Sequence, residues 1–502
     1  MDEALPGHTE PVASRRSRRR RKRGPRITFP GPLVAICAVL AVVVGLGEAT
    51  LPDDRAQLTG LHEERVPIGM ARLVCPDAGS HDVAMVAPGS GKGRATLHEV
   101  GSDGSAAATL DSGPSRTSSA VDGSANALVA TAKHGAAPGF EAAEYDRDNS
   151  GSDRGLRDTR CVRPGRSWWF AGATIGTGYE ADLYLSNVDS SPATVDIRAY
   201  GKEGPVDPLA GRGITVDAGK RKVVDLSRIA PHLSMSALHV VAQSGRVSAA
   251  LRVQAKEDDT SYGVSWVPPS QQPAKDVVVP AVPAGSGDRK LVLFAPGQQG
   301  TTASVRLSTP DGSYAPAGHD SVNVPARQAV AVGLGDVMAK SATAVQVTAS
   351  VPLVAAVVAI EGGSGEDGSI AYSASTAALH EPGAVPVVPS GGNLKAALEL
   401  TAPRDDATVT VTALHGTKSE KLKSVRVPAG RTVKVKLKPR WGGSPYAVVL
   451  DPLGSGGPVY ASRVLTATPG AGPLISAQPV VSSERAVTLP PVVSDVGAGV
   501  PG

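Results

Sequence analysis

The chain has 502 residues, of which 41% are hydrophobic, 20% charged and only 3% aromatic. This length predicts several domains, and the ordinary charge content excludes a wholly disordered chain. The formal net charge is +4, but residues 1–26 hold nine basic and three acidic side chains. The remaining 42 basic and 44 acidic residues leave the rest of the chain at −2. This near-neutral body argues against nucleic acid as a partner.

The segment after the basic tail predicts a membrane anchor. Residues 33–47, LVAICAVLAVVVGLG, carry no charge, and Glu48 and Asp53 follow them. The positive-inside rule therefore predicts a single-pass helix over 31–50, with the tail 1–26 cytoplasmic and the bulk of the chain extracytoplasmic. The run is short for a spanning helix, so a cleaved signal peptide and secretion is the alternative. We favour the anchor because a clean small-residue cleavage pattern is missing.

The three cysteines divide between the anchor and the exported part. Cys37 lies within the apolar run, which leaves Cys75 and Cys161 outside the cytoplasm. Two cysteines in that compartment usually pair, so we predict a disulfide between them. A metal or redox pair is the weaker alternative, because neither has another Cys or His nearby at ligand spacing.

The exported part predicts strands throughout and an all-β fold class. Valine, threonine and period-two alternation dominate, and Gly, Pro, Asp and Ser separate the runs. Clear examples are residues 181–188, 193–201, 247–253, 291–295 and 408–414. Residues 98–126, which are rich in Ser, Gly, Ala and Asp, instead predict a loose loop.

Three sequence patterns recur with a period of about 105 residues. The first begins at residues 216, 324 and 427, as VDAGKRKVVDLS, VPARQAVAVGLG and VPAGRTVKVKLK. The second begins at 236, 343 and 446 and predicts a hairpin. The third begins at 168, 277, 384 and 487. The period predicts β modules at 164–272, 273–380 and 381–502, the last with a C-terminal strand, and a divergent module at 59–163.

One run resembles a known type of repeat. WWFAGATIGTGYEADLYLSNVDSSPATVDIRAYG, followed by ITVDAGKRKVVDLSRIAP and ALHVVAQSGRVSAALRV, is similar to bacterial extracytoplasmic repeats that open with a W-[YF]-[FL]-A motif. The chain resembles an uncharacterised actinobacterial family of membrane-anchored secreted proteins built on such repeats. This resemblance implies location and architecture, and it carries no activity.

Two architectures fit the repeats. One is a tandem array of immunoglobulin-like β-sandwiches, one per repeat, like beads on a stalk. The other is a propeller-like closed ring in which each repeat supplies two four-stranded blades. We favour the sandwiches, because the repeat length matches one sandwich.

Candidate functional residues are few. Asp146, Asp148 and Ser150, followed by a glycine, imitate the start of a calcium loop, but Arg157 stands where the closing Glu belongs. An exposed acidic loop is the alternative. Trp168 and Trp169 are candidates for stacking on a sugar ring, against the alternative that they pack in a core. We find no catalytic motif and predict neither a catalytic residue nor a cofactor.

These observations favour a non-enzymatic, membrane-anchored cell-envelope protein that binds or scaffolds wall polysaccharide or envelope proteins. An extracytoplasmic glycan-active enzyme is one alternative, because carboxylates can converge from distant loops. An accessory subunit of an envelope glycan-assembly system is another.

Overall fold

The computed structural model describes residues 64–489, apart from 77–80, 103, 112, 122–125, 207–208, 336–337, 339–340 and 363–366. Nearer the N-terminus it describes only Val39, Ala41 and Val42, which are helical. The basic tail 1–26 and the remainder of the predicted anchor 31–50 therefore lie outside the described residues. Within the described part, no helix is long and apolar enough to cross a membrane.

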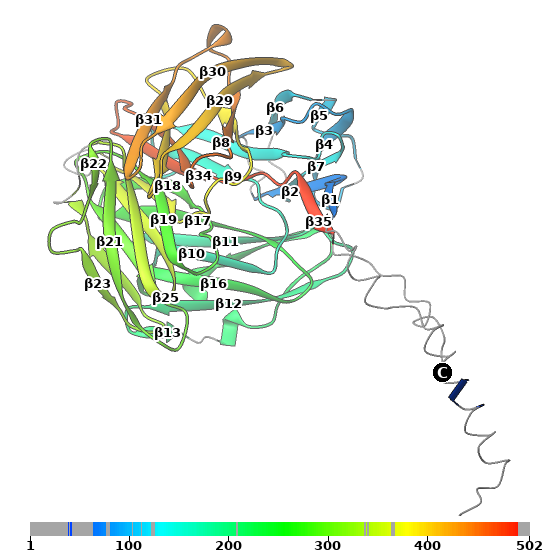
Figure 1. Cartoon of the computed structure of the whole chain (residues 1–502). Helices are drawn as coiled ribbons and strands as arrows, with labels where there is room; N and C mark the ends of the chain where they lie inside the picture. Colours follow the sequence, from blue (N-terminus) through cyan, green and yellow to red (C-terminus); the bar gives the residue numbers. More distant parts are fainter. Residues whose placement is uncertain are drawn as a thin grey trace, which may run out of the picture. The chain divides into compact units, whose positions relative to one another are not determined.

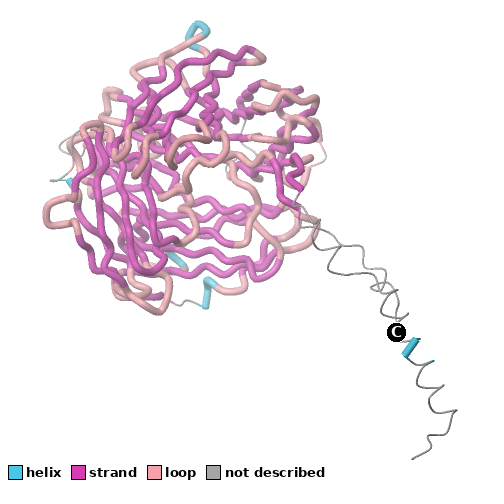
Figure 2. Tube along the Cα trace, viewed as in Figure 1, coloured by secondary structure: helices cyan, strands magenta, loops and turns pink. Residues whose placement is uncertain are grey.

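The four predicted modules are called repeats 1 to 4 in chain order. The chain divides into two compact units, and the strands of these repeats lie in the second unit, Arg65–Thr488. It is all-β, as predicted (Figures 1 and 2). Its few other regular elements include the 3-10 turns η1 (Leu209–Gly211), η2 (Leu226–Arg228) and η4 (Trp441–Gly443).

Each repeat supplies its own strands. Repeat 1 has β2 (Met70–Cys75), β3 (His81–Ala87), β4 (Gly93–Glu99), β5 (Ala108–Asp111), β6 (Ser115–Val121), β7 (Leu128–His134), β8 (Glu141–Asp148) and β9 (Gly155–Arg160). Repeat 2 has β10 (Ser167–Ile175), β11 (Tyr179–Asn187), β12 (Ala193–Gly201), β13 (Gly204–Val206), β14 (Ile214–Val216), β15 (Lys220–Asp225), β16 (Leu233–Ser244), β17 (Ser248–Glu257) and β18 (Thr260–Val267).

The later repeats follow the same plan. Repeat 3 has β19 (Ala274–Val282), β20 (Arg289–Phe294), β21 (Thr301–Thr309), β22 (Gly312–Tyr314), β23 (Ser321–Val324), β24 (Ala329–Gly333), β25 (Thr343–Glu361) and β26 (Ser369–Ala374). Repeat 4 has β27 (Gly383–Val388), β28 (Lys395–Ala402), β29 (Ala407–His415), β30 (Lys418–Val427), β31 (Arg431–Leu437), β32 (Tyr446–Pro452), β33 (Tyr460–Ala467) and β34 (Leu474–Val480).

Each repeat forms two antiparallel sheets with one shared strand order. In repeat 1 the first sheet runs β2-β7-β4-β5 and the second β6-β3-β8-β9, and in repeat 4 they run β27-β32-β29-β30 and β31-β28-β33-β34. Repeat 2 has the same order, with β14 added beside β12. In repeat 3 the long strand β25 belongs to both sheets, which it joins into one.

The predicted hairpins at residues 236, 343 and 446 are wrong. Strands β16 and β17 follow one another in the chain, but β16 pairs with β10 and β12, whereas β17 pairs with β11 and β18. In repeat 3 the continuous strand β25 replaces the turn. Two strands joined by a short link show the same alternation of apolar and polar residues in both cases, whether they pair with each other or belong to two different sheets. The sequence alone therefore could not reveal their partners.

The loose loop predicted over 98–126 is also wrong. Strands β5 and β6 lie within it, at the edges of the two sheets of repeat 1. An edge strand has one hydrogen-bonded neighbour and one open side, so small polar residues are compatible with it. Their low β-propensity weakened the sequence pattern here.

Each sheet buries one face inside its repeat and part of its other face between repeats. The two sheets of a repeat enclose a core, as Leu73 and Met85 show in repeat 1. The faces directed away from that core meet the neighbouring repeat. Apolar side chains form each of these contacts. Val74 of repeat 1 packs with Val188 of repeat 2, and Trp169 of repeat 2 packs with Phe294 of repeat 3. Ala281 of repeat 3 packs with Val464 of repeat 4, and Leu414 of repeat 4 packs with Val86 of repeat 1.

The contact between repeats 4 and 1 completes the series. Beads on a stalk would leave the first and last modules apart, with their outer faces in water. The structure instead buries these apolar faces against each other, which is favourable because apolar area leaves the solvent. The expectation of a linear array is therefore wrong.

The last strands of the four repeats, β9, β18, β26 and β34, contact one another in cyclic order. Beside them, the fully buried Arg154 of repeat 1 links all four repeats. Its Nη2 donates to the carbonyl oxygens of Gly472 (3.1 Å) and Pro473 (3.3 Å) in repeat 4. Its Nε lies 3.8 Å from Asp367 Oδ2 in repeat 3, and its carbonyl oxygen accepts from Val264 N of repeat 2 at 2.8 Å.

A terminal pair of strands lies beside repeat 1. Strand β1 (Glu64–Pro67) pairs with β35 (Ala486–Leu489). The segment before β35 is bound to repeat 1, because Gly139 N donates to Glu484 O (2.8 Å) and Ile68 N to Arg485 O (3.0 Å). The pattern that recurs at residue 487 therefore forms an extra terminal strand.

Candidate functional site

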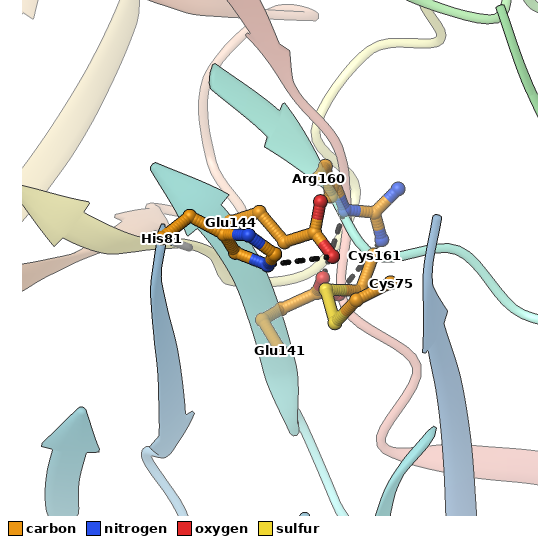
Figure 3. The surroundings of a disulfide bond; sticks show 6 residues. All are labelled: Cys75, His81, Glu141, Glu144, Arg160 and Cys161. Carbon is orange, nitrogen blue, oxygen red and sulfur yellow. Dashed lines mark hydrogen bonds and ion pairs between the residues drawn. A yellow bond between two sulfur atoms is a disulfide. The ribbon is translucent and has the colours of Figure 1, made fainter. Parts of the chain in front are cut away.

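The predicted disulfide is present. Cys75, the last residue of β2, is bonded to Cys161, which directly follows β9, and their Cα atoms are 4.3 Å apart. Both cysteines are fully buried. The bond therefore joins the first strand of repeat 1 to the link that leads into repeat 2, as the sequence predicts (Figure 3).

One ion pair and one histidine–carboxylate contact lie near the disulfide in Figure 3. Arg160 donates to both carboxylate oxygens of Glu141, at 2.8 and 2.9 Å. His81 Nε2 lies 3.3 Å from Glu144 Oε1. Both glutamates project from β8 and are buried. Because each carboxylate faces its own basic partner across the sheet, this cluster ties β3, β8 and β9 together and has a structural role.

Side-chain oxygens of the calcium candidates Asp146 and Asp148 already have partners within the protein. Asp146 and Asp148 lie on β8, and Ser150 follows it. Asp146 forms an ion pair with Arg157, its partner in the register of β9. Asp148 Oδ1 accepts from Ser150 N at 3.2 Å. The arginine that occupies the place of the closing Glu therefore also neutralises the first aspartate.

The two tryptophans lie on β10 in different environments. Trp169 is only 4% exposed. Its ring stacks on His239, with centroids 3.7 Å apart, and lies 5.7 Å from the ring of Phe294 in repeat 3. Trp168 is half-buried, and its Nε1 donates to Val247 O at 3.1 Å. The packing alternative therefore accounts for Trp169, whose covered ring is not available to a sugar.

The strongest candidate site is a cleft in repeat 4 that we call the lysine cleft. It has a volume of about 520 Å³ and is lined by parts of β28, β31 and β33. Four of its lining residues are Lys395, Lys434, Lys436 and Lys438, and none is acidic. Because the chain outside its basic tail has a net charge near zero, this cleft is a local concentration of positive charge.

The alternation of β31 produces this arrangement. In RTVKVKL, Val433 and Val435 pack against the core of repeat 4. The alternate residues Lys434 and Lys436 therefore project from the opposite face of the sheet. On that same face Thr432 Oγ1 donates to Ser308 O of repeat 3 at 2.9 Å. The lysine cleft thus occupies the part of this face that repeat 3 leaves open.

A buried carboxylate lies beneath the cleft. Glu399 on β28 is opposite Lys434 in the register, and its side chain is 0% exposed. Lys434 Nζ is 3.7 Å from Glu399 Oε1, and neither carboxylate oxygen has a hydrogen-bond partner among the described residues. Burial raises the pKa of Glu399 to about 7, although the charge of Lys434 opposes this shift. The carboxyl group is therefore partly protonated near neutral pH.

The chemistry of the cleft is that of an anion receptor. Within the described part of the chain, the ammonium groups of Lys395, Lys436 and Lys438 have no hydrogen-bond or ion-pair partner. Lysine supplies three donors on a flexible stem, which suits spaced phosphate or carboxylate groups. In the sequence, the lysines of β31 are marked only by the alternation VKVKLK, which is part of the recurring pattern that begins at residue 427.

Comparison with known proteins adds one match. Residues 116–438 match the model of a family of unknown function (DUF5719). The matched region contains all four lysines of the cleft. No curated protein and no solved structure matches the chain.

Proposed function

Because the chain belongs to this family of unknown function (DUF5719), its role must be argued from its own residues, and we propose that it binds an anionic polysaccharide of the cell envelope through the lysine cleft. In this proposal it is a non-enzymatic extracytoplasmic protein with an N-terminal membrane anchor. The basic tail and the uncharged run 33–47 support the topology.

The lysine cleft is the observation that carries the proposal. Four cationic side chains line one cavity, and three of them have no partner among the described residues. An extended polyanion gains from such an array because each charge adds a modest attraction and the sum raises both affinity and association rate. A neutral glycan could accept hydrogen bonds from the ammonium groups but would lack the charge attraction.

For the architecture we propose a propeller-like closed ring of eight blades, two from each repeat. The support is the cyclic packing of the four repeats and the contact of their last strands. Such a ring restrains the strands that carry the surface residues, because each repeat packs against two neighbours. A rigid scaffold reduces the ordering cost of ligand binding.

The test is retention of isolated envelope polymer by the full chain in detergent. We compare the wild type with Lys395→Gln/Lys436→Gln/Lys438→Gln. The matched control is Lys418→Gln/Lys421→Gln/Lys423→Gln, which removes the same charge from exposed positions on β30 of the same repeat. We expect the cleft variant to lose retention by about tenfold or more, the control by less than about twofold, and the wild type to weaken as salt rises.

Two results would overturn the proposal. Equal losses in the two triple variants would show that general charge, and not the cleft, retains the polymer. Absence of wild-type retention, with capture of one specific membrane protein instead, would favour the accessory-subunit alternative.

A further inference from the structure

A second basic cleft lies between repeats 2 and 3, and we call it the arginine cleft. Its volume is about 570 Å³, and it is lined by β12 and β13 of repeat 2 and by Arg327 of repeat 3. Arg198 and Arg212 are the other basic residues of the lining, and Asp196 is the acidic one. The net charge of the lining is therefore +2.

Strand β12 fixes the first wall. Asp196, Arg198 and Tyr200 alternate along it and share one face. Arg198 is exposed, and it has no hydrogen-bond or ion-pair partner among the residues that the structure describes. Its neighbour in the register is His239 of β16. Burial, aided by the charge of Arg198, lowers the pKa of His239 to about 4, so the imidazole is neutral at pH 7.

Arg327 contributes to the lining from repeat 3. It lies between β23 and β24 with a left-handed backbone (φ 58°), and its N–H donates to Ala295 O at 2.8 Å. Its guanidinium carbon is 5.9 Å from the ring centroid of Tyr200, whose ring is packed 4.6 Å from that of Phe294. This cation–π contact positions the guanidinium, while its N–H groups have no hydrogen-bond partner in the described part of the chain.

The acidic residue of the cleft is already engaged. Asp196 Oδ1 accepts from Gly213 N at 2.9 Å, and Oδ2 accepts from Gln243 Nε2 at 2.8 Å. The carboxylate is therefore held by neutral donors. The guanidinium groups of Arg198 and Arg327 remain available in the lining of one cavity.

We propose that the arginine cleft is a second, separate site, which binds a compact oxyanion between Arg198 and Arg327. A guanidinium presents a planar fork that matches the two oxygens of a carboxylate or phosphate. The lysine cleft presents point charges on flexible stems, three of them without a partner among the described residues, and suits a spaced polyanion. The two sites lie in different repeats and differ in donor chemistry, so the second does not depend on the first.

The experiment is calorimetric titration of the full chain in detergent at low salt with three probes, namely sodium glucuronate, glucose 1-phosphate and neutral glucose. We compare the wild type with Arg198→Gln/Arg327→Asn, because Asn tolerates the left-handed backbone at position 327. Arg228→Gln is the matched control, since its side chain is 84% exposed and does not line the cleft. Arg198→Lys keeps the charge but removes the fork.

We expect at least one anionic probe to bind, and glucose not to bind. The double variant should weaken that binding by about tenfold or more, Arg198→Lys by several-fold, and Arg228→Gln by less than about twofold. Binding of glucuronate alone would identify a carboxylate ligand, and binding of glucose 1-phosphate alone a phosphate ligand.

The triple lysine variant distinguishes this proposal from the proposed function. It should bind the small probe as the wild type does, even if polymer retention is lost. Wild-type protein that gives no heat with either anion, or a correctly folded double variant that binds like the wild type, would refute the arginine site.

Discussion

Arg463 of repeat 4 and Asp158 of repeat 1 form an ion pair whose side chains are only 3% and 1% exposed. Arg463 also donates through Nη1 to Val387 O, and Gln478 Nε2 donates to Asp158 O at 2.6 Å. Burial lowers the pKa of Arg463 to about 10, so it remains charged at neutral pH. A buried charge pair thus lies where the last repeat meets the first.

Arg463→Met should therefore weaken the contact between repeats 4 and 1. Removing one partner leaves the carboxylate of Asp158 buried and unpaired, which costs about 3–5 kcal/mol. Urea unfolding measures this loss. Arg246→Met is the control, because its partner Asp189 and the pair as a whole are more exposed, and the cost there should be below about 1 kcal/mol. Similar losses in the two variants would show that the buried pair has no special role.

Removal of the disulfide should destabilise repeat 1. Cys75→Ala/Cys161→Ala frees a loop of 86 residues, and the chain-entropy model predicts a loss of about 4.5 kcal/mol. Urea unfolding with and without a reductant measures it. The reductant should destabilise the wild type and leave the double variant unchanged, and an equal response in both would contradict the prediction.

Glu399 should give the stability a pH dependence near neutrality. Its pKa is raised in the folded chain to about 7, so the folded state holds a proton that the unfolded state has released between about pH 4.5 and 7. The contribution of this bound proton to the free energy of unfolding is fully present below the pKa that Glu399 has in the unfolded chain. It is lost as the pH rises through 7.

Glu399→Gln removes that dependence. The variant should be more stable than the wild type at pH 8, by about 3 kcal/mol, and nearly equal to it at pH 4. Unfolding curves at several pH values test this, with Glu420→Gln as an exposed control on β30. The prediction fails if the two variants show the same profile.

The two adjacent tryptophans should differ in their effect on stability. Trp169→Ala removes a buried ring from the contact between repeats 2 and 3 and should cost about 3–5 kcal/mol. Trp168→Ala removes a half-buried ring and one hydrogen bond, so its cost should be near 1–2 kcal/mol. Thermal unfolding of the two variants compares their losses of stability. If instead Trp168→Ala alone abolished polymer retention without loss of stability, this result would support the prediction that Trp168 stacks on a sugar ring.

The strands and the disulfide could be predicted because each has a local signal. Period-two alternation marked β12 at its observed bounds, 193–201. The pairing of Cys75 with Cys161 followed from counting cysteines in one compartment. In contrast, the contact of Val86 with Leu414 uses apolar residues no different from those of any core. The sequence therefore did not distinguish an array from a closed arrangement.

The candidate site was missed for a related reason. Lys436 was visible in an alternating strand, but an outward lysine is usually a solvated surface residue. Its neighbour in the lysine cleft, Lys395, comes from a distant strand, and only the register of β28 with β31 brings them to one face. Arg198 and Arg327 belong to different repeats, so their approach also depends on tertiary packing.

Strand β25 spans 19 residues and is hydrogen-bonded in both sheets of repeat 3. One of these sheets faces repeat 4, and the other faces repeat 2. The same strand therefore ties the sheet that faces repeat 4 to the sheet that faces repeat 2, with residues 343–348 paired in one and residues 354–359 in the other. The two sheets of repeat 3 are thus joined by covalent bonds as well as by packing, so they cannot move apart unless the hydrogen bonds of one ladder break.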